Sequence, residues 1–197
     1  MPNIIIHFRK ILRYDPTFGG KYSRFEGYKM IVTQEADPEI VDSRENVLNL
    51  PENINFPVYC SSLKRGVMTL KNYFQLQDII PLDELREVRF HLDSLLTNEE
   101  YEEFGSDLVR ERFLLAFIAD SLDEKREEIK NRVLSLIERL SKLSEGSYLV
   151  VSHSFFLKIL EVYFKDKSLF DNPEILKDHF DPKKKMFEFG QGFDVLI

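Results

Sequence analysis

The stretch Ser147–Ser154, with the sequence SYLVVSHS, decides how this chain is expected to fold. Gly146 ends the amphipathic segment before it, and the uncharged β-formers of the stretch predict a buried strand. The segment Phe155–Phe164 follows at once and has the spacing of a helix. A strand that feeds a helix would place His153 at the carboxyl end of the strand. In open α/β sheets ligands bind at that edge, where the first N–H groups of the next helix favour an anion.

A second apolar run, Asn3–His7, has the sequence NIIIH and also ends in a histidine. If the two runs form parallel strands, they deliver His7 and His153 to the same edge of the sheet. A single strand-end histidine such as His153 is more often a polar residue satisfied by a backbone partner. The pair is what favours a functional site.

Length and composition limit the kind of protein to which such a site belongs. A chain of 197 residues with 43% hydrophobic residues predicts one domain over residues 1–197 with a substantial core. The net charge of −7 argues against nucleic-acid or anionic-membrane binding, so an anion site requires a local cluster of cations. Cys60 is the single cysteine, which excludes an internal disulfide framework and a Cys-rich metal site. We find no leader and no run that approaches the ~20 residues of a membrane span, and expect a cytoplasmic protein.

The chain between the first run and residue 55 begins with a cluster of basic residues. Arg9, Lys10 and Arg13 follow His7 closely, and one of these cations is expected to point into the site. The segment Tyr28–Thr33 is compatible with a short strand, and a helix is expected to start within residues 37–43.

A clearer unit is Phe56–Phe74, in which a β-rich run is followed by apolar residues at helical spacing. The turn at Ser61-Ser62 predicts the end of a strand and a helix cap. Arg65 then falls in the first turn of the helix, where the helix dipole disfavours a cation. This position indicates an anionic partner, although an ordinary surface arginine is the alternative.

The rest of the chain continues the alternation of strands and helices and predicts an α/β domain. Ile79-Ile80 predicts a short strand, and the acidic stretch after it supplies a candidate carboxylate, Glu87. Two helices are expected in an insertion at about residues 92–120. A long amphipathic helix is predicted from about Asp123 to Leu143, and a terminal hairpin over residues 187–197.

Four short motifs occur in a recognisable order. Arg-His-Gly after the first strand is matched by Ile6-His7-Phe8, and Ser-Ser-Pro-Leu-x-Arg-Ala-x-x-Thr by residues 60–69, CSSLKRGVMT. Leu-x-Glu is matched by Leu85-Arg86-Glu87, and Val-Ser-His-Gly by residues 151–154, VSHS. In this order the motifs resemble those of the histidine phosphatase superfamily, which includes the cofactor-dependent phosphoglycerate mutases.

The resemblance implies a three-layer α/β/α fold with a mostly parallel central sheet, as in phosphoglycerate mutases. It implies that His7 attacks phosphorus to give a phosphohistidine, while Arg65 and His153 bind the phosphoryl oxygens. Glu87 would protonate the leaving alcohol and then activate water. This chemistry requires no metal and no cofactor.

The first motif departs from the family pattern, because Ile6 replaces an arginine that would bind phosphate. A charge-assisted hydrogen bond of this kind contributes about 1.5–3 kcal/mol. We expect Arg13 to compensate, with Arg9 as the second candidate. Phe8 and Ser154 also replace glycines, which adds side chains where the backbone approaches the phosphate closely.

Two functions of different classes follow. The first is a metal-independent phosphomonoesterase that acts through phosphohistidine on a small phosphorylated metabolite. The second is a catalytically impaired member that binds a phospho-ligand or a partner. A doubly wound domain of unrelated function is the remaining alternative. A homodimer is left open, since the 13% aromatic content suits a dimer patch or a core equally well.

Overall fold

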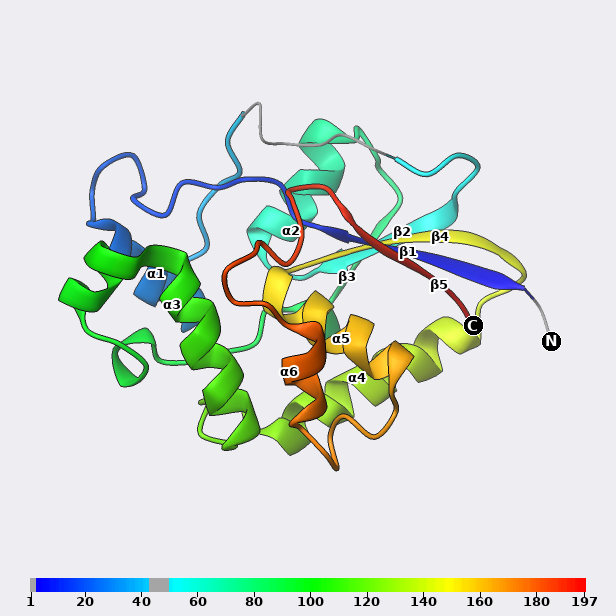
Figure 1. Ribbon diagram of the computed structural model, residues 1–197. Coiled ribbons are helices and arrows are strands. Elements are labelled where there is room, and N and C mark those ends of the chain that lie inside the picture. Colours follow the sequence, from blue (N-terminus) through cyan, green and yellow to red (C-terminus); the bar gives the residue numbers. More distant parts are fainter. Residues whose placement is uncertain (1–2, 43–49) are drawn as a thin grey trace.

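The computed structural model describes residues 3–42 and 50–197 and has a five-stranded sheet at its centre (Figure 1). The strands lie in the order β3-β2-β4-β1-β5. Neighbouring strands run parallel except for β5, which pairs antiparallel to β1. The mostly parallel sheet confirms the predicted α/β class. The strands are β1 (Ile4–Lys10), β2 (Asn55–Ser61), β3 (Ile79–Leu82), β4 (Gly146–Ser152) and β5 (Gly192–Leu196).

Helices cover both faces of the sheet, which gives the three layers (Figure 1). Helix α2 lies on one face and helices α4, α5 and α6 on the other, while α1 and α3 stand beyond the carboxyl ends of the parallel strands. None of the helices in the described part of the chain is long and apolar enough to cross a membrane. The helices are α1 (Arg24–Val32), α2 (Lys64–Met68), α3 (Asn98–Ile118), α4 (Arg126–Ser141), α5 (Ser154–Lys165) and α6 (Ile175–His179).

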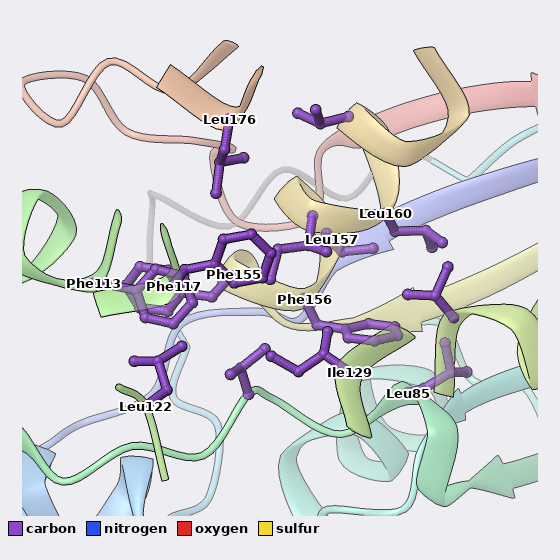
Figure 2. Close-up of a cluster of buried hydrophobic side chains, with 14 of the residues drawn as sticks. Leu85, Phe113, Phe117, Leu122, Ile129, Phe155, Phe156, Leu157, Leu160 and Leu176 are labelled. Carbon is purple, nitrogen blue, oxygen red and sulfur yellow. The ribbon is translucent and has the colours of Figure 1, made fainter. Parts of the chain in front are cut away.

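An apolar cluster fixes the helices beneath the sheet (Figure 2). Phe113 of α3 stacks on Phe155 of α5 with ring centroids 3.9 Å apart. Phe90 meets Phe155 edge to face at 5.6 Å, and Ile129 of α4 packs into the same cluster. These contacts hold the first turn of α5, directly after β4, in one position.

Several predicted elements are confirmed. The strand that feeds a helix is β4 followed by α5, with His153 at the N-cap, and Arg65 lies in the first turn of α2. The two expected helices after residue 92 appear as α3, which Gly105 divides with a φ of 60°.

Three other expectations are wrong. Residues 28–32 belong to α1, because the Ser23 side chain caps that helix by accepting a hydrogen bond from the Glu26 N–H. Residues 37–42 are not helical and form a bridge between Tyr14 and Ile40, while residue 43 lies outside the described residues. The terminal hairpin is replaced by the single strand β5. At Gly192 any side chain would meet the carbonyl of Phe8, so this glycine allows the close approach to β1.

The first strand is also longer than expected, which matters for the site. It was expected to end at His7 but continues through Arg9 and Lys10, whose backbones pair with β4. The cations find partners at the other end of the chain, because Arg9 contacts Asp194 and Lys10 contacts the Phe187 carbonyl. His7 is therefore an internal residue of the strand.

Candidate functional site

A pocket of about 380 Å³ opens at the carboxyl ends of β1 and β4, between the sheet and the helices α1 and α3. Its walls hold six cations and one carboxylate in a protein of net negative charge. This is the local cluster of cations that the overall charge requires of an anion site. The cations are Lys10, Arg13, Arg24, Arg65, Arg110 and Lys185, and the carboxylate is Glu87.

Arg65 is the most deeply buried of these cations, with 1% of its surface exposed. Its Nη1 donates to Oδ1 of Asp37 at 2.6 Å, and its guanidinium lies 5.5 Å from the centre of the Tyr14 ring. Its Nε is buried and has no hydrogen-bond partner among the described residues. A buried donor without a partner is costly, so Arg65 has capacity for a further acceptor.

His153 stands at the end of β4 with 2% of its surface exposed. Its Nε2 lies 2.8 Å from the Ser61 hydroxyl. Burial, and then the positive charges of Arg65 and Arg132, lower the pKa of His153 well below its usual range. The imidazole is therefore neutral at pH 7.

Glu87 lies on the other side of the same helix start, 8% exposed. Its carboxylate accepts hydrogen bonds from the backbone N–H groups of Val88, Phe155 and Phe156. Burial raises the pKa of Glu87, and these N–H groups and Arg65 oppose the shift. Two N–H groups in the first turn of α5, a region predicted to favour an external anion, are thus satisfied by an internal carboxylate.

Lys10, at the last position of β1, also lines the pocket; the sequence placed it among three cations near His7 but named only Arg13 and Arg9 as phosphate-binding residues. Its Nζ donates to the Phe187 carbonyl at 3.1 Å and lies 4.1 Å from the centre of the Phe189 ring. Burial lowers the pKa of Lys10 to about 8, which still leaves most of the side chain charged at pH 7. No carboxylate of the described residues forms an ion pair with it. The alternation of Ile4, Ile6 and Phe8 toward the core was the signal that the strand runs on to Lys10.

The two arginines expected to bind phosphate are placed differently. Arg13 lines the pocket, as expected. Arg9 does not line it, so this expectation is wrong. Its Nη1 donates to Oδ1 of Asp194 at 2.7 Å and to the Phe8 carbonyl, because alternate residues of a strand point to opposite faces and Arg9 shares a face with His7.

His7 does not line the pocket either. It pairs with Leu149 in the register of β1 and β4, four residues before His153. At about 3.3 Å per residue this is a displacement of roughly 13 Å along the strands. The His7 ring has partners of its own, with Nε2 2.9 Å from the Ser147 hydroxyl and Nδ1 3.0 Å from Oδ1 of Asp194. The expectation that His7 and His153 converge on one phosphoryl group is wrong.

Ile11 stands where that second imidazole was expected. Lys10 pairs with Ser152, and the Ile11 N–H donates to the Ser152 carbonyl at 2.8 Å, which puts Ile11 level with His153. Ile11 is 2% exposed and lines the pocket. In space, Lys10-Ile11-Leu12 therefore takes the place of the Arg-His-Gly motif. The pocket brings together Arg65, Glu87 and His153, but it has an aliphatic side chain in place of a nucleophilic histidine.

The sequence matches the histidine phosphatase superfamily (branch 1) over residues 47–175, which is more than half of the chain. The chain belongs to the histidine phosphatase superfamily. The matched range contains Arg65, Glu87 and His153, and β1 lies outside it. The strand that leads to Ile11 thus lies outside the matched range of this superfamily member.

A solved structure of a phosphoglycerate mutase shares the fold. Phosphoglycerate mutase from Bacillus anthracis str. Sterne is 15% identical, with a TM-score of 0.56, and the match covers 100% of this chain and 88% of the mutase. A mutant of phosphoserine phosphatase from Entamoeba histolytica, in complex with phosphoserine, is 12% identical with a TM-score of 0.45, over 100% and 90% of the two chains. No curated protein sequence gives a significant match. Among the described residues of this superfamily member, no group of three or more His, Cys, Asp or Glu side chains is arranged to hold a metal ion.

Proposed function

We propose that this protein binds a phosphomonoester through its phosphate group in the pocket at the carboxyl edge of the sheet, and that it forms no phosphohistidine. The observation that carries the proposal is the position of Ile11, level with His153 on the neighbouring strand. An aliphatic side chain has no lone pair with which to attack phosphorus. The phosphate can be held there next to His153, but the second imidazole that would attack phosphorus is replaced by Ile11.

Two buried cations support the binding of an anion. Lys10 contacts only a carbonyl and a ring, and Arg65 has an Nε without a partner in the described part of the chain. A phosphate dianion supplies three acceptor oxygens and nearly two negative charges, which suits both groups. Hydrogen bonds to charged groups contribute about 1.5–3 kcal/mol each, so two of them are enough for measurable affinity.

His153 adds a neutral partner to this pair of cations. A neutral imidazole has one N–H donor, and a phosphate oxygen near Arg65 is a suitable acceptor for it. An approaching anion also counteracts the positive charges that lower the pKa of His153, so binding of phosphate is expected to be accompanied by proton uptake.

The alternative function is metal-independent hydrolysis of a phosphomonoester. The arrangement of Arg65, Glu87 and His153 around one pocket favours it, because these residues would bind the phosphoryl group and protonate the leaving alcohol. Hydrolysis would have to proceed without His7, which faces Ser147 and Asp194.

Two measurements on the purified protein separate these functions. Calorimetric titration with inorganic phosphate is expected to show saturable binding, and p-nitrophenyl phosphate in the presence of EDTA is expected to show no turnover. Turnover that survives EDTA and disappears in Arg65→Gln would contradict the proposal and select hydrolysis. Absence of phosphate binding would contradict both functions.

A further inference from the structure

The pocket has two chemically different halves. The half at the strand ends contains Lys10, Arg65 and His153, which is where the proposed function places the phosphate group. The other half lies under the helices α1 and α3 and the loop before β5, and most of its lining is aromatic or aliphatic. Its apolar and aromatic residues include Tyr28, Ile31 and Val32 of α1, Tyr101 and Val109 of α3, and Phe189 of the loop.

We propose that the ligand is an aryl phosphomonoester, in which the phosphate is attached to an aromatic ring that lies between these aromatic side chains. The inference rests on the proposed function, because it takes the phosphate end of the site as given and names the chemistry of the remainder. It concerns a small molecule enclosed in the pocket. A volume of about 380 Å³ is at the small end of the range of pockets that bind such ligands.

Aromatic surfaces are present near both ends of the pocket. The rings of Tyr28 and Tyr101 are nearly parallel, with an interplanar angle of 27° and centroids 6.2 Å apart. Phe25 packs against Tyr101 at 5.6 Å and supports it from behind. Phe189 lies 4.1 Å from the Lys10 ammonium, next to the phosphate end. A ligand ring attached directly to the phosphate would therefore meet aromatic side chains as soon as it leaves the cationic half.

A sugar phosphate fits this lining poorly. The uncharged hydroxyl groups of the wall come only from Ser106, Ser154 and three tyrosines of the described residues. Ser106 already accepts a hydrogen bond from Arg110 at 3.2 Å. Each sugar hydroxyl that loses water and finds no partner costs free energy, and an aromatic ring has no such requirement.

A second anionic group on the ligand is also disfavoured. Arg110 already donates to Oδ1 of Asp107 at 2.5 Å and to the Pro182 carbonyl at 2.7 Å. Lys185 pairs with Glu188 at 3.0 Å. Arg110 and Lys185 thus have internal partners, whereas Lys10 forms no ion pair within the described chain. A ligand with one anionic group and an apolar remainder matches this distribution of cations.

Calorimetric titrations with four probes test the inference. The probes are inorganic phosphate, ethyl phosphate, phenyl phosphate and glucose 6-phosphate. Phenyl phosphate is expected to bind at least about tenfold more tightly than ethyl phosphate, since burial of the ring adds apolar and aromatic contact. Glucose 6-phosphate is expected to bind no more tightly than ethyl phosphate.

Variants locate the preference in the pocket. Phe189→Leu is expected to reduce the ratio of phenyl phosphate affinity to ethyl phosphate affinity several-fold. A change in phosphate binding would affect both ligands equally and leave this ratio unchanged. Phe104→Leu is the matched control, because Phe104 is an exposed phenylalanine of α3 outside the pocket lining. If Phe189→Leu does not fold, Tyr28→Leu provides the same measurement at a lining residue of α1.

The outcomes distinguish this inference from the proposed function. If inorganic phosphate binds but phenyl phosphate is no tighter than ethyl phosphate, or glucose 6-phosphate is tighter than both, the aryl inference is overturned and phosphate binding stands. An equal loss of ring preference in Phe104→Leu and Phe189→Leu also overturns it. If no probe binds, the proposed function itself is overturned.

Discussion

Strands β1 and β4 are parallel neighbours with similar apolar sequences. One histidine lies within β1 and another directly after β4, yet only one of the two histidines reaches the pocket. His153 follows the last residue of β4 and lies in the cationic pocket. His7 lies inside β1, where the Ser147 hydroxyl and the Asp194 carboxylate contact its two nitrogens. A histidine in an apolar run is thus a site residue only if the strand ends there. The role of the histidine therefore depends on its distance from the carboxyl end of the strand, and the residue type alone does not predict it.

The two environments also differ in charge. Burial, and then the positive charges of nearby cations such as Arg65, lower the pKa of His153 and keep it neutral. His7 and Arg9 face Asp194. Burial acts to raise the pKa of Asp194, but the hydrogen bonds from Arg9 and His7 outweigh it, so the pKa is lowered overall. The end of β4 can accept an anion, whereas the middle of β1 already faces the Asp194 carboxylate of β5.

The largest effect is expected from removing the support of the β4 end. Phe155→Ala deletes a buried ring that stacks on Phe113, at a residue of the first α5 turn whose N–H donates to Glu87. Phenylalanine truncations in cores cost about 3–5 kcal/mol in the free energy of unfolding. Urea denaturation measures this, and the exposed Phe104→Ala is the control, with an expected change within about 0.5 kcal/mol. Equal losses in both variants would show that the α5 junction is not packed as described.

A pair of arginine variants sharpens the comparison at the level of phosphate binding. Arg65→Gln removes a buried guanidinium of the pocket and is expected to weaken inorganic phosphate binding by about tenfold to a hundredfold. Arg9→Gln changes an arginine on β1 that faces Asp194 and is expected to leave the affinity unchanged. Calorimetric titration compares the two. A larger loss in Arg9→Gln would place the anion site on the wrong side of the sheet.

The two histidines themselves form the next pair. His153→Ala is expected to weaken phosphate binding by about tenfold, through loss of one hydrogen bond, while His7→Ala leaves binding unaltered. Circular dichroism checks that both variants are folded before titration. Comparable loss in His7→Ala would return His7 to the site and refute the register argument.

The smallest effect concerns the pH dependence of stability. The pKa of His153 is lowered in the folded protein, so below about pH 6.5 the unfolded chain binds a proton that the folded chain does not. The contribution of neutral His153 to stability is therefore present above that pH and is lost as the pH falls. Its slope is at most about 1.4 kcal/mol per pH unit.

Denaturation of the wild type and His153→Ala at about pH 7.5 and pH 5.5 measures this contribution. The difference between the two proteins isolates His153 from Glu87, whose raised pKa acts in the opposite direction. An identical pH dependence in the two proteins would mean that the imidazole is not held neutral by burial.

The sequence predicted the site residues that follow a strand whose end is indicated by the residues next to it. Arg65 and His153 each follow an apolar run that stops at polar residues within the same few positions, and Glu87 follows a short strand in the same way. The residues next to the end of β1 do not indicate where it ends. The strand continues to Lys10 because Arg9 contacts Asp194 and Lys10 contacts the Phe187 carbonyl, both far along the chain. The match of His7 to the first motif failed for that reason.

The fold shows the same division between local and distant causes. The α/β class, β4 and α4 follow from composition and periodicity along the chain itself. The segment over residues 28–32 has β-forming residues, but the Ser23 cap and the packing of Ile31 and Val32 in the core make it helical. The last strand, β5, pairs with β1 rather than with the residues just before it. No pattern within residues 187–197 indicates this pairing.

The most direct test of the central claim is to supply the missing imidazole. Ile11→His and the wild type are each incubated with p-nitrophenyl phosphate in EDTA, and covalent phosphate is measured by intact mass at neutral pH and after acid treatment. The account predicts an acid-labile phosphate at position 11 of the variant and none on the wild type. Phosphate on His7 of the wild type, or a folded Ile11→His that binds phosphate but never becomes labelled, would contradict it.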